Sequence, residues 1–255
     1  MYASSRLWIV IKLNLTDAIV TQTIGQPMPS MPIPVRVFHI TAIDNLAAIF
    51  EQGALLCKQR SEDEGRVYHN IAHAGAQGAR ANKAVVDPPG GHIHDYVPFY
   101  FAPRSPMLLA IHHGKVEGCH YRQEDIVHIE LLARTVHDNG GEFVFFDRNA
   151  TKAYSQCYTD PTMLKDVVDW ELLTEAPQLD GFCKFFQDQH DVDRYIDRME
   201  KRQAEFLVKD EVPVAWTKRI GVASEAKAEQ VRALVAAHGL HLPVEVMTDW
   251  YFFGQ

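Results

Sequence analysis

Three short polar segments lie beside strand-like apolar residues and could carry chemistry: FHIT at 38–41, QGAR at 77–80 and KRQAEFLV at 201–208. In the third segment, the two-residue period of a strand directs Gln203 and Glu205 to one face and the apolar residues between them to the other. Glu205 is therefore a carboxylate at the start of a strand that faces a cleft. The alternative is a surface glutamate on an edge strand.

Other common chemistries find no support in the residue pattern. The histidines group as His69-x3-His73, His92-x-His94-Asp95, His112-His113 and Cys119-His120. None of these groups has the CxxC or HExxH spacing of a zinc site, so we expect no metal. The sequence also lacks the GxGxxG and P-loop motifs, which argues against nucleotide binding of the Rossmann and P-loop kinds. It lacks G-x-S-x-G as well, which argues against a serine hydrolase.

Composition limits the possible partners. The 255 residues contain 25 basic and 33 acidic side chains, a net charge of −8. That balance argues against coating nucleic acid or anionic lipid by bulk electrostatics, although a local groove remains open. The four cysteines have no short spacing, so we expect reduced thiols in a cytoplasm.

The first 34 residues differ from the rest of the chain. They end in the proline-rich QPMPSMPIP, which denies them a regular helix or a central strand. We interpret 1–34 as an extension, either a genuine arm or a translated stretch upstream of a start at Met28 or Met31. The apolar run 7–15 is too short and too polar for an anchor or signal peptide. We expect one domain over 35–255.

From residue 35 the pattern predicts a mixed α/β fold. A strand at 35–40 precedes a helix that Thr41 or Asp44 could cap and Gly53 could end. Further strands are predicted in VPFYFAP, DIVHIELLA, GEFVFFD, QAEFLVKDEVP, RIGVAS and PVEVMTDWYFF, with helices at 105–112 and 225–238. Strands and helices do not alternate regularly, so a doubly wound sheet is not favoured. The polar stretch 58–88 is too long for a simple connection, which is typical of a functional loop.

Four longer segments carry a resemblance: FHITAIDNLAAIFEQGALL, PPGGHIHDYVPFYFAPRSPMLLAI, GEFVFFDRNA and KRQAEFLVKDEVP. In this order and spacing they resemble the DarT family of bacterial DNA ADP-ribosyltransferase toxins, over residues 35–253. The resemblance implies an α+β ADP-ribosyltransferase fold in which split antiparallel sheets surround an NAD cleft, with peripheral helices. It also implies transfer of ADP-ribose from the co-substrate NAD to thymidine in single-stranded DNA, a macrodomain antitoxin of the DarG type, and a bacterial cytoplasmic location without a membrane.

The resemblance also assigns the NAD and catalytic residues. His39, Ile40 and Thr41 would bind the nicotinamide side of NAD, with Asn45 and Leu56 nearby, while Arg80 and Glu205 would be catalytic. Cleavage of the nicotinamide–ribose bond makes the ribose oxocarbenium-like, and a carboxylate at its 2′-OH stabilises that charge. Glu205 suits this role, and the guanidinium of Arg80 suits the pyrophosphate. Either residue could take part in removing the N3 proton of thymine.

Other residues would contact DNA. Met107 and Asn149 match base-pocket positions, although a core methionine and a turn asparagine are equally good interpretations. Relatives tend to have histidine near position 149, so base or sequence preference could differ here. Arg148 would lie on the DNA side, and Gln203 would help to select the target. A short basic path would use Arg148, Lys152, Tyr154, Arg194, Tyr195, Arg198, Lys201 and Arg202, unless 194–202 is simply a solvated helical face. The segment 61–82 would fold over NAD, and 148–204 would present the base.

Two alternatives remain. One keeps the fold and NAD but changes the acceptor to protein, RNA or water. The other is a catalytically silent nucleotide-binding or DNA-binding module.

Overall fold

The computed structural model describes residues 31–72 and 74–254. The apolar run 7–15 and most of the expected extension 1–34 lie outside these residues. The last four residues of that segment, 31–34, have no regular secondary structure. The boundary between 34 and 35 stays a prediction.

An eight-stranded sheet forms the centre of the molecule, in the order β14-β13-β6-β1-β5-β11-β7-β8. Its strands are β1 (Arg36–Ala42), β5 (Tyr96–Tyr100), β6 (Ile126–Leu132), β7 (Phe143–Phe146), β8 (Cys157–Tyr158), β11 (Glu205–Lys209), β13 (Arg219–Val222) and β14 (Val244–Val246). All neighbours pair antiparallel except β13 and β14. The strands expected from sequence are therefore present, although β14 covers only three residues of its predicted run.

The sheet divides into two four-stranded halves between β1 and β5. Across this junction the register contains one residue pair, Phe38 opposite Tyr100, whereas β1 pairs with β6 along its whole length. This geometry matches the expected split sheets, joined at one point.

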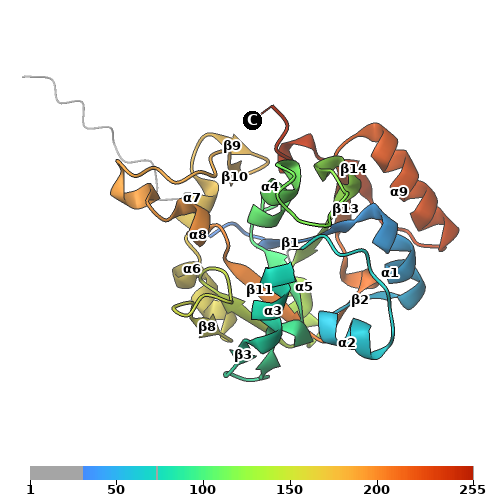
Figure 1. Cartoon of the computed structure of the whole chain (residues 1–255), viewed down its shortest axis with the longest axis horizontal. Coiled ribbons are helices and arrows are strands. Elements are labelled where there is room, and N and C mark those ends of the chain that lie inside the picture. The colour runs from blue at the N-terminus through green and yellow to red at the C-terminus, as the bar shows by residue number, and fades with distance from the viewer. Residues whose placement is uncertain (1–30, 73, 255) are drawn as a thin grey trace, which may run out of the picture.

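Short strand pairs and helices surround the sheet (Figure 1). The pairs are β12 (Glu211–Pro213) with β2 (Ala54–Leu56), β3 (Ala84–Val85) with β4 (Gly91–His92), and β9 (Gln178–Leu179) with β10 (Phe182–Cys183). The α-helices are α1 (Leu46–Gln52), α2 (Lys58–Asp63), α3 (Ala74–Asn82), α4 (Pro106–His112), α5 (Ala133–Asp138), α6 (Leu164–Val167), α7 (Trp170–Thr174), α8 (Arg198–Lys201) and α9 (Glu225–Ala237). Two of these helices, α2 and α3, lie in the polar stretch 58–88 that the sequence left as a loop.

Local sequence explains the ends of several helices. Gly53 ends α1 in the left-handed conformation at φ 73°, which glycine adopts without steric cost. The Ser105 hydroxyl accepts a hydrogen bond from the Leu108 N–H at the start of α4. The predicted side-chain cap by Thr41 or Asp44 is wrong: α1 is preceded by a short 3-10 helix (Ile43–Asn45), and neither N-cap side chain accepts a hydrogen bond there.

Candidate active site

Glu205 begins β11, which lies between β5 and β7 in the middle of one half-sheet. Its register partners are Tyr100 on β5 and Phe146 on β7. The side chain is 1% exposed, so the alternative of a surface glutamate on an edge strand is wrong. The apolar residues that alternate with it, Ala204, Phe206 and Val208, belong to the hydrophobic core as predicted.

Arg80 is the ion-pair partner of Glu205. Its Nη1 donates to both carboxylate oxygens, at 2.9 Å to Oε1 and 3.0 Å to Oε2. Arg80 lies on α3, which Figure 1 places in front of the sheet beside β11. The other terminal nitrogen, Nη2, is buried and has no hydrogen-bond partner among the described residues. A buried unused donor is costly unless a ligand satisfies it, so this nitrogen is available to an anionic substrate.

The position of α3 depends on a histidine that the sequence considered only as a metal ligand. His94 is buried, and its Nε2 lies 3.0 Å from Oε1 of Gln77, one turn before Arg80. Burial and then the charge of Arg80 lower the pKa of His94, so the ring is neutral and can donate this bond from Nε2. Gln77 of the QGAR segment thus orients the helix that carries the arginine.

His39 lies on β1 at the junction of the two half-sheets. Its Nδ1 lies 2.8 Å from the carbonyl oxygen of Pro98, which can only accept. Burial lowers the pKa of His39 to about 4, against the opposing effect of that hydrogen bond. The ring is therefore neutral at pH 7, with its proton on Nδ1 and Nε2 left as an acceptor. The next residue, Ile40, is buried in the core, so only its backbone can contact a ligand.

Asn45 connects the end of β1 to the segment before α3. Its Nδ2 donates to Thr41 Oγ1 at 2.9 Å and to the His69 carbonyl at 3.0 Å. Its Oδ1 accepts from the His69 N–H at 2.7 Å. Asn45 is buried, with its amide used by protein partners, so its first effect is to hold Thr41 and the segment at His69 in place. Leu56 is also buried, on β2 opposite Glu211.

Tyr100 is a functional candidate that sequence reasoning missed. It lies opposite Glu205 in the β5–β11 register and opposite Phe38 at the junction. Burial, followed by the Glu205 carboxylate, raises the pKa of Tyr100, and Arg80 opposes this effect. The phenol is therefore a neutral hydroxyl beside the ion pair. Only the register of two strands distant in sequence places it there.

Of the predicted DNA residues, Asn149 lies near Gln203, two positions before Glu205. Asn149 Nδ2 lies 3.4 Å from Gln203 Oε1, and Asn149 Oδ1 accepts from the backbone and hydroxyl of Thr151. Arg148 pairs with Asp147 at 2.9 Å and with Glu200 at 2.6 Å. Met107 is partly buried and packs against the core. This agrees with its interpretation as a core methionine, while its exposed part leaves the base-pocket interpretation as a prediction.

The predicted basic path needs correction. Arg198 and Arg202 are each 2% exposed, so they do not lie on a solvent-exposed path or on a solvated helical face. Arg194 pairs with Glu171 and Glu175, and Lys201 pairs with Asp169 and Asp197. The physical reason is that the segment 184–197 folds back over α8 and encloses its arginines.

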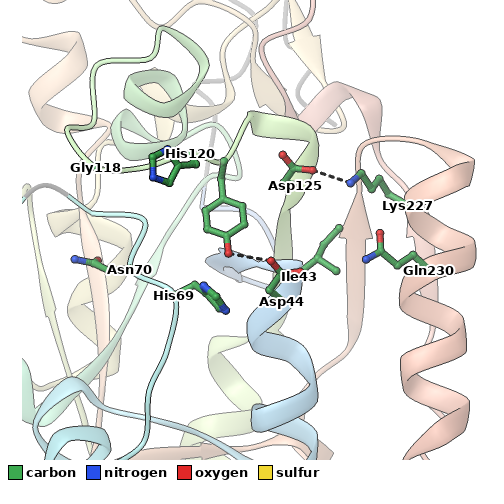
Figure 2. Close-up of a pocket in the computed structure, with 10 residues that line it drawn as sticks. Ile43, Asp44, His69, Asn70, Gly118, His120, Asp125, Lys227 and Gln230 are labelled. Carbon is green, nitrogen blue, oxygen red and sulfur yellow. Dashed lines mark hydrogen bonds and ion pairs between the residues drawn. The ribbon is translucent and has the colours of Figure 1, made fainter.

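A pocket of about 570 Å³ lies next to the Asn45 contact (Figure 2). It is lined by Ile43, Asp44, His69, Asn70, Gly118, His120, Tyr121, Asp125, Lys227 and Gln230. Two contacts cross it: the Tyr121 hydroxyl donates to Asp44 at 2.9 Å, and Lys227 donates to Asp125 at 2.7 Å. Figure 2 shows His69 at the lower left of the pocket and Gln230, which lies on α9, at its right. Carboxylates, amides and an aromatic ring are groups that can hold a polar, ring-containing ligand.

Two further searches cover only the described part of the chain. In residues 31–72 and 74–254, no cluster of three or more His, Cys, Asp or Glu side chains is suited to hold a metal ion. Over the same ranges, none of the helices combines the length and the apolar character that a membrane crossing requires.

The sheet split at one residue pair, with a buried carboxylate and an arginine beside the junction, belongs to a fold of the ADP-ribosyltransferase class, as the following comparisons show. Residues 38–252 match the family model described as ssDNA thymidine ADP-ribosyltransferase, DarT. A DNA ADP-ribosyl transferase of Thermus sp. (strain 2.9) is 36% identical over 225 residues, which are 87% of this chain and 98% of that protein. This chain belongs to the DarT family.

Solved structures agree with this assignment. Thermus sp. 2.9 DarT in complex with ADP-ribosylated ssDNA matches with a TM-score of 0.77 at 34% identity, over 88% of this chain and 99% of that one. The same protein in complex with NAD+ matches with a TM-score of 0.74 at 33% identity, over 88% and 100%. The expected fold, the use of NAD and the class of reaction are therefore confirmed.

Proposed function

We propose that this chain transfers ADP-ribose from NAD to thymidine bases in single-stranded DNA, with Glu205 and Arg80 as its catalytic residues. The observation that carries the proposal is the buried pair of Arg80 and Glu205, with one guanidinium nitrogen left for a ligand. The relatives' complexes with NAD+ and with ADP-ribosylated ssDNA support this substrate pair.

NAD binds along β1 and across the junction in this proposal. His39, Thr41 and the backbone of Ile40 hold the nicotinamide side, Asn45 and Leu56 shape the wall, and Arg80 Nη2 donates to the pyrophosphate. The pocket beside Asn45 takes the adenosine end, where the ribose hydroxyls meet the side chains of Asp44 and Asn70.

The reaction breaks the bond between ribose C1′ and the nicotinamide nitrogen and forms a bond between C1′ and N3 of thymine. Positive charge develops on the ribose as nicotinamide leaves with the bonding electron pair. Glu205 accepts a hydrogen bond from the ribose 2′-OH and stabilises that charge. The N3 proton must pass to a base in the same step. The Glu205 carboxylate can accept it, whereas the charged guanidinium of Arg80 is a poor base and takes part as a hydrogen-bond donor.

The DNA side of the site is formed by Gln203, Asn149, Arg148 and Met107. Asn149 and Gln203 present amide groups, which can pair with the edge of a base. The segment 148–204 would present the base to NAD, and 61–82, which includes α3, would cover the dinucleotide.

We further propose that the protein acts as a toxin in a bacterial cytoplasm and that a macrodomain antitoxin of the DarG type reverses its modification. The family assignment supports this context. Co-expression tests it: survival of cells that express the chain should require either the macrodomain protein or inactivation of Glu205.

The decisive experiment incubates the protein with labelled NAD and single-stranded oligonucleotides that differ only in thymidine content. We expect label on thymidine-containing strands alone, sensitive to nuclease and resistant to proteinase. Glu205→Gln should reduce transfer by about 100-fold or more, as removal of one electrostatic group at a reacting centre does. Glu211→Gln, which alters a half-exposed glutamate paired with Arg60, is the matched control.

The other outcomes decide between the alternatives. Label on protein or RNA would change the acceptor, and release of free ADP-ribose would make the acceptor water. Absence of turnover with every acceptor would favour the silent module.

A further inference from the structure

Three arginines next to the active site are buried without enough partners. Arg104, Arg198 and Arg202 are each 2% exposed. Arg104 follows β5 by four residues, and Arg202 precedes Glu205 of β11 by three residues. Tyr100, the last residue of β5, is the register partner of Glu205, the first residue of β11. Arg104 and Arg202 therefore lie beyond the same end of these two strands as Glu205.

Most of their nitrogen donors are unused among the described residues. Nε and Nη2 of Arg104, Nε of Arg198, and all three nitrogens of Arg202 are buried without a hydrogen-bond partner. In the described part of the chain three bonds exist: Arg104 Nη1 donates to the Lys184 carbonyl at 2.8 Å, and Arg198 donates from Nη2 to Glu175 at 2.8 Å and from Nη1 to the Gln187 carbonyl at 3.5 Å. Native proteins leave few buried donors unpaired, and a cluster of six is exceptional.

Aromatic rings fix the orientation of the guanidinium groups. The Cζ of Arg104 lies 4.5 Å from the ring centroid of Phe252, and that of Arg202 lies 5.2 Å from Phe186. These two rings contact each other at 5.7 Å. Stacking satisfies the faces of the guanidinium groups and leaves their edges, where the N–H groups point, free for another ligand.

The cluster has excess positive charge in a buried position. Among the described residues, Arg198 has one ion-pair partner, Glu175, which also pairs with Arg194. No ion pair to a carboxylate is found there for Arg104 or Arg202. Burial is the main cause that lowers the pKa of Arg202 to about 10. The charges of Arg104 and Arg198 lower it further, whereas Cys183 opposes the shift. At pH 7 the group is still charged. A buried charge that lacks a counter-ion is destabilising, and an anion with several acceptor oxygens would remove that cost.

The segment that covers the cluster has features of a nucleic-acid surface. Phe185 and Ile196, at either end of 184–197, are each 48% exposed. Phe185 supplies one exposed ring, and its centroid lies 5.9 Å from the Cζ of Arg198. An exposed aromatic ring next to arginines is a place where a single-stranded nucleic acid can stack a base and neutralise its backbone. This arrangement favours a DNA phosphate over a free anion.

We propose that Arg104, Arg198 and Arg202 form a binding site for one phosphodiester group of the single-stranded DNA, next to the target thymidine. The inference rests on the proposed function and adds the residues that hold the strand. Segment 184–197 shifts to admit the strand, Phe185 stacks on a base, and the free N–H groups of the three arginines donate to the phosphate oxygens.

The proposal predicts opposite effects on stability and on binding. Arg202→Met removes an uncompensated buried charge at similar side-chain length, so the free protein should become more stable. The same change removes donors to the phosphate, so the affinity for DNA should fall. A merely structural arginine would give a less stable protein.

The test measures binding of a fluorescent thymidine-containing single-stranded oligonucleotide by anisotropy, without NAD, between about 50 and 200 mM salt. For Arg202→Met we expect a Kd at least tenfold higher, a salt slope smaller by about 0.7 per lost phosphate contact, an unchanged KM for NAD and a higher urea midpoint. Arg202→Lys should recover part of the affinity. Arg134→Met, which removes an arginine 82% exposed on α5, should change none of these quantities.

Three results would overturn the inference: an unchanged oligonucleotide Kd, a lower urea midpoint, or a raised KM for NAD with unchanged DNA binding, which would assign the site to the NAD pyrophosphate. The proposed function fails separately, if the wild-type protein neither binds the oligonucleotide nor transfers label to it. Transfer by wild type with no effect of Arg202→Met would reject only the phosphate site.

Discussion

At the scale of single residues, the Tyr100 hydroxyl and the Glu205 carboxylate share one cross-strand position beside Arg80. A phenol that stays neutral can donate to the carboxylate or to a ribose hydroxyl without adding charge. In the proposed mechanism, we expect Tyr100 to help position the substrate while Glu205 stabilises its charge.

We expect Tyr100→Phe to lower kcat by about tenfold to 100-fold, because the hydroxyl that would donate a hydrogen bond at the reacting centre is removed. Stability should change little, since the ring remains. The measurement is the initial rate of label transfer at saturating NAD. Tyr96→Phe is the control: its hydroxyl donates to the Gly90 carbonyl at 2.7 Å, so its loss should cost about 1 kcal/mol of stability and no activity.

Sequence predicts single residues only where local rules determine them. The two-residue alternation around Glu205 correctly separated its face from the core face of β11. The sequence could not show that Arg80 contacts Glu205, because the two are 125 positions apart. It also could not show that Arg198 and Arg202 are buried, because that depends on how segment 184–197 folds over them.

At the scale of elements, Asn45 joins β1 to the segment that leads into α3. Three hydrogen bonds of one buried amide connect Thr41 and His69, so the end of β1 and the segment at His69 are held together. Sequence predicted Asn45 near NAD from the resemblance. Its connecting role depends on the contact between Asn45 and the backbone of His69, 24 positions later. No local sequence pattern predicts that contact.

Asn45→Ala should raise the KM for NAD by about tenfold with a smaller effect on kcat, because the segment at His69 loses its anchor while Glu205 keeps its strand position. Amide hydrogen exchange at 66–72 should accelerate. Asn139→Ala is the matched control, since that side chain is exposed at the end of α5, away from 61–82, and donates to the Thr135 carbonyl. Unchanged exchange at 66–72 would contradict the anchoring role.

The packing of β13 against the C-terminal segment gives a second prediction at this scale. A Cβ at Gly221 would lie 2.2 Å from the ring of Trp250, which is fully buried. Gly221→Ala should therefore lower the free energy of unfolding by about 1–3 kcal/mol, measured by urea denaturation. Gly78→Ala on α3, where nothing lies within 4 Å, should be neutral or stabilising by up to about 1 kcal/mol.

At the scale of the whole molecule, the core depends on buried histidines staying neutral. His128 is 0% exposed on β6, with Nε2 3.0 Å from the Pro103 carbonyl. Burial lowers the pKa of His128 to about 4, against the effect of that hydrogen bond. In the unfolded chain the same group takes up a proton near its ordinary pKa of about 6.5.

The folded pKa lies below the unfolded one, so the unfolded state binds more protons as the pH falls. The free energy of unfolding should therefore decrease between pH 6.5 and about 4, by about 3 kcal/mol from His128. Urea denaturation at pH 7, 6 and 5 measures this decrease. His128→Gln should reduce the slope, and an unchanged slope would show that His128 does not titrate on unfolding.

The predicted fold class also belongs to this scale. The irregular alternation of strands and helices correctly excluded a doubly wound sheet. The division of the sheet into two halves was predicted only from the resemblance to the DarT family. Hydrophobic patterns identified the long strands, but the two-residue strands β3, β4, β9 and β10 are too short to produce one. Their pairing is set by tertiary contacts that form only when the sheet is in place.

The unused Nη2 of Arg80 has a consequence for how the enzyme meets its substrate. One nitrogen of the guanidinium donates to Glu205, and the other has no partner in the described part of the chain, so an arriving anion does not have to displace the carboxylate. If these two residues act as proposed, they are in place before NAD binds, and little reorganisation energy remains to be supplied during the reaction. The site is thus preorganised because the two terminal nitrogens of one guanidinium have different partners: Nη1 holds Glu205, and Nη2 can receive the substrate.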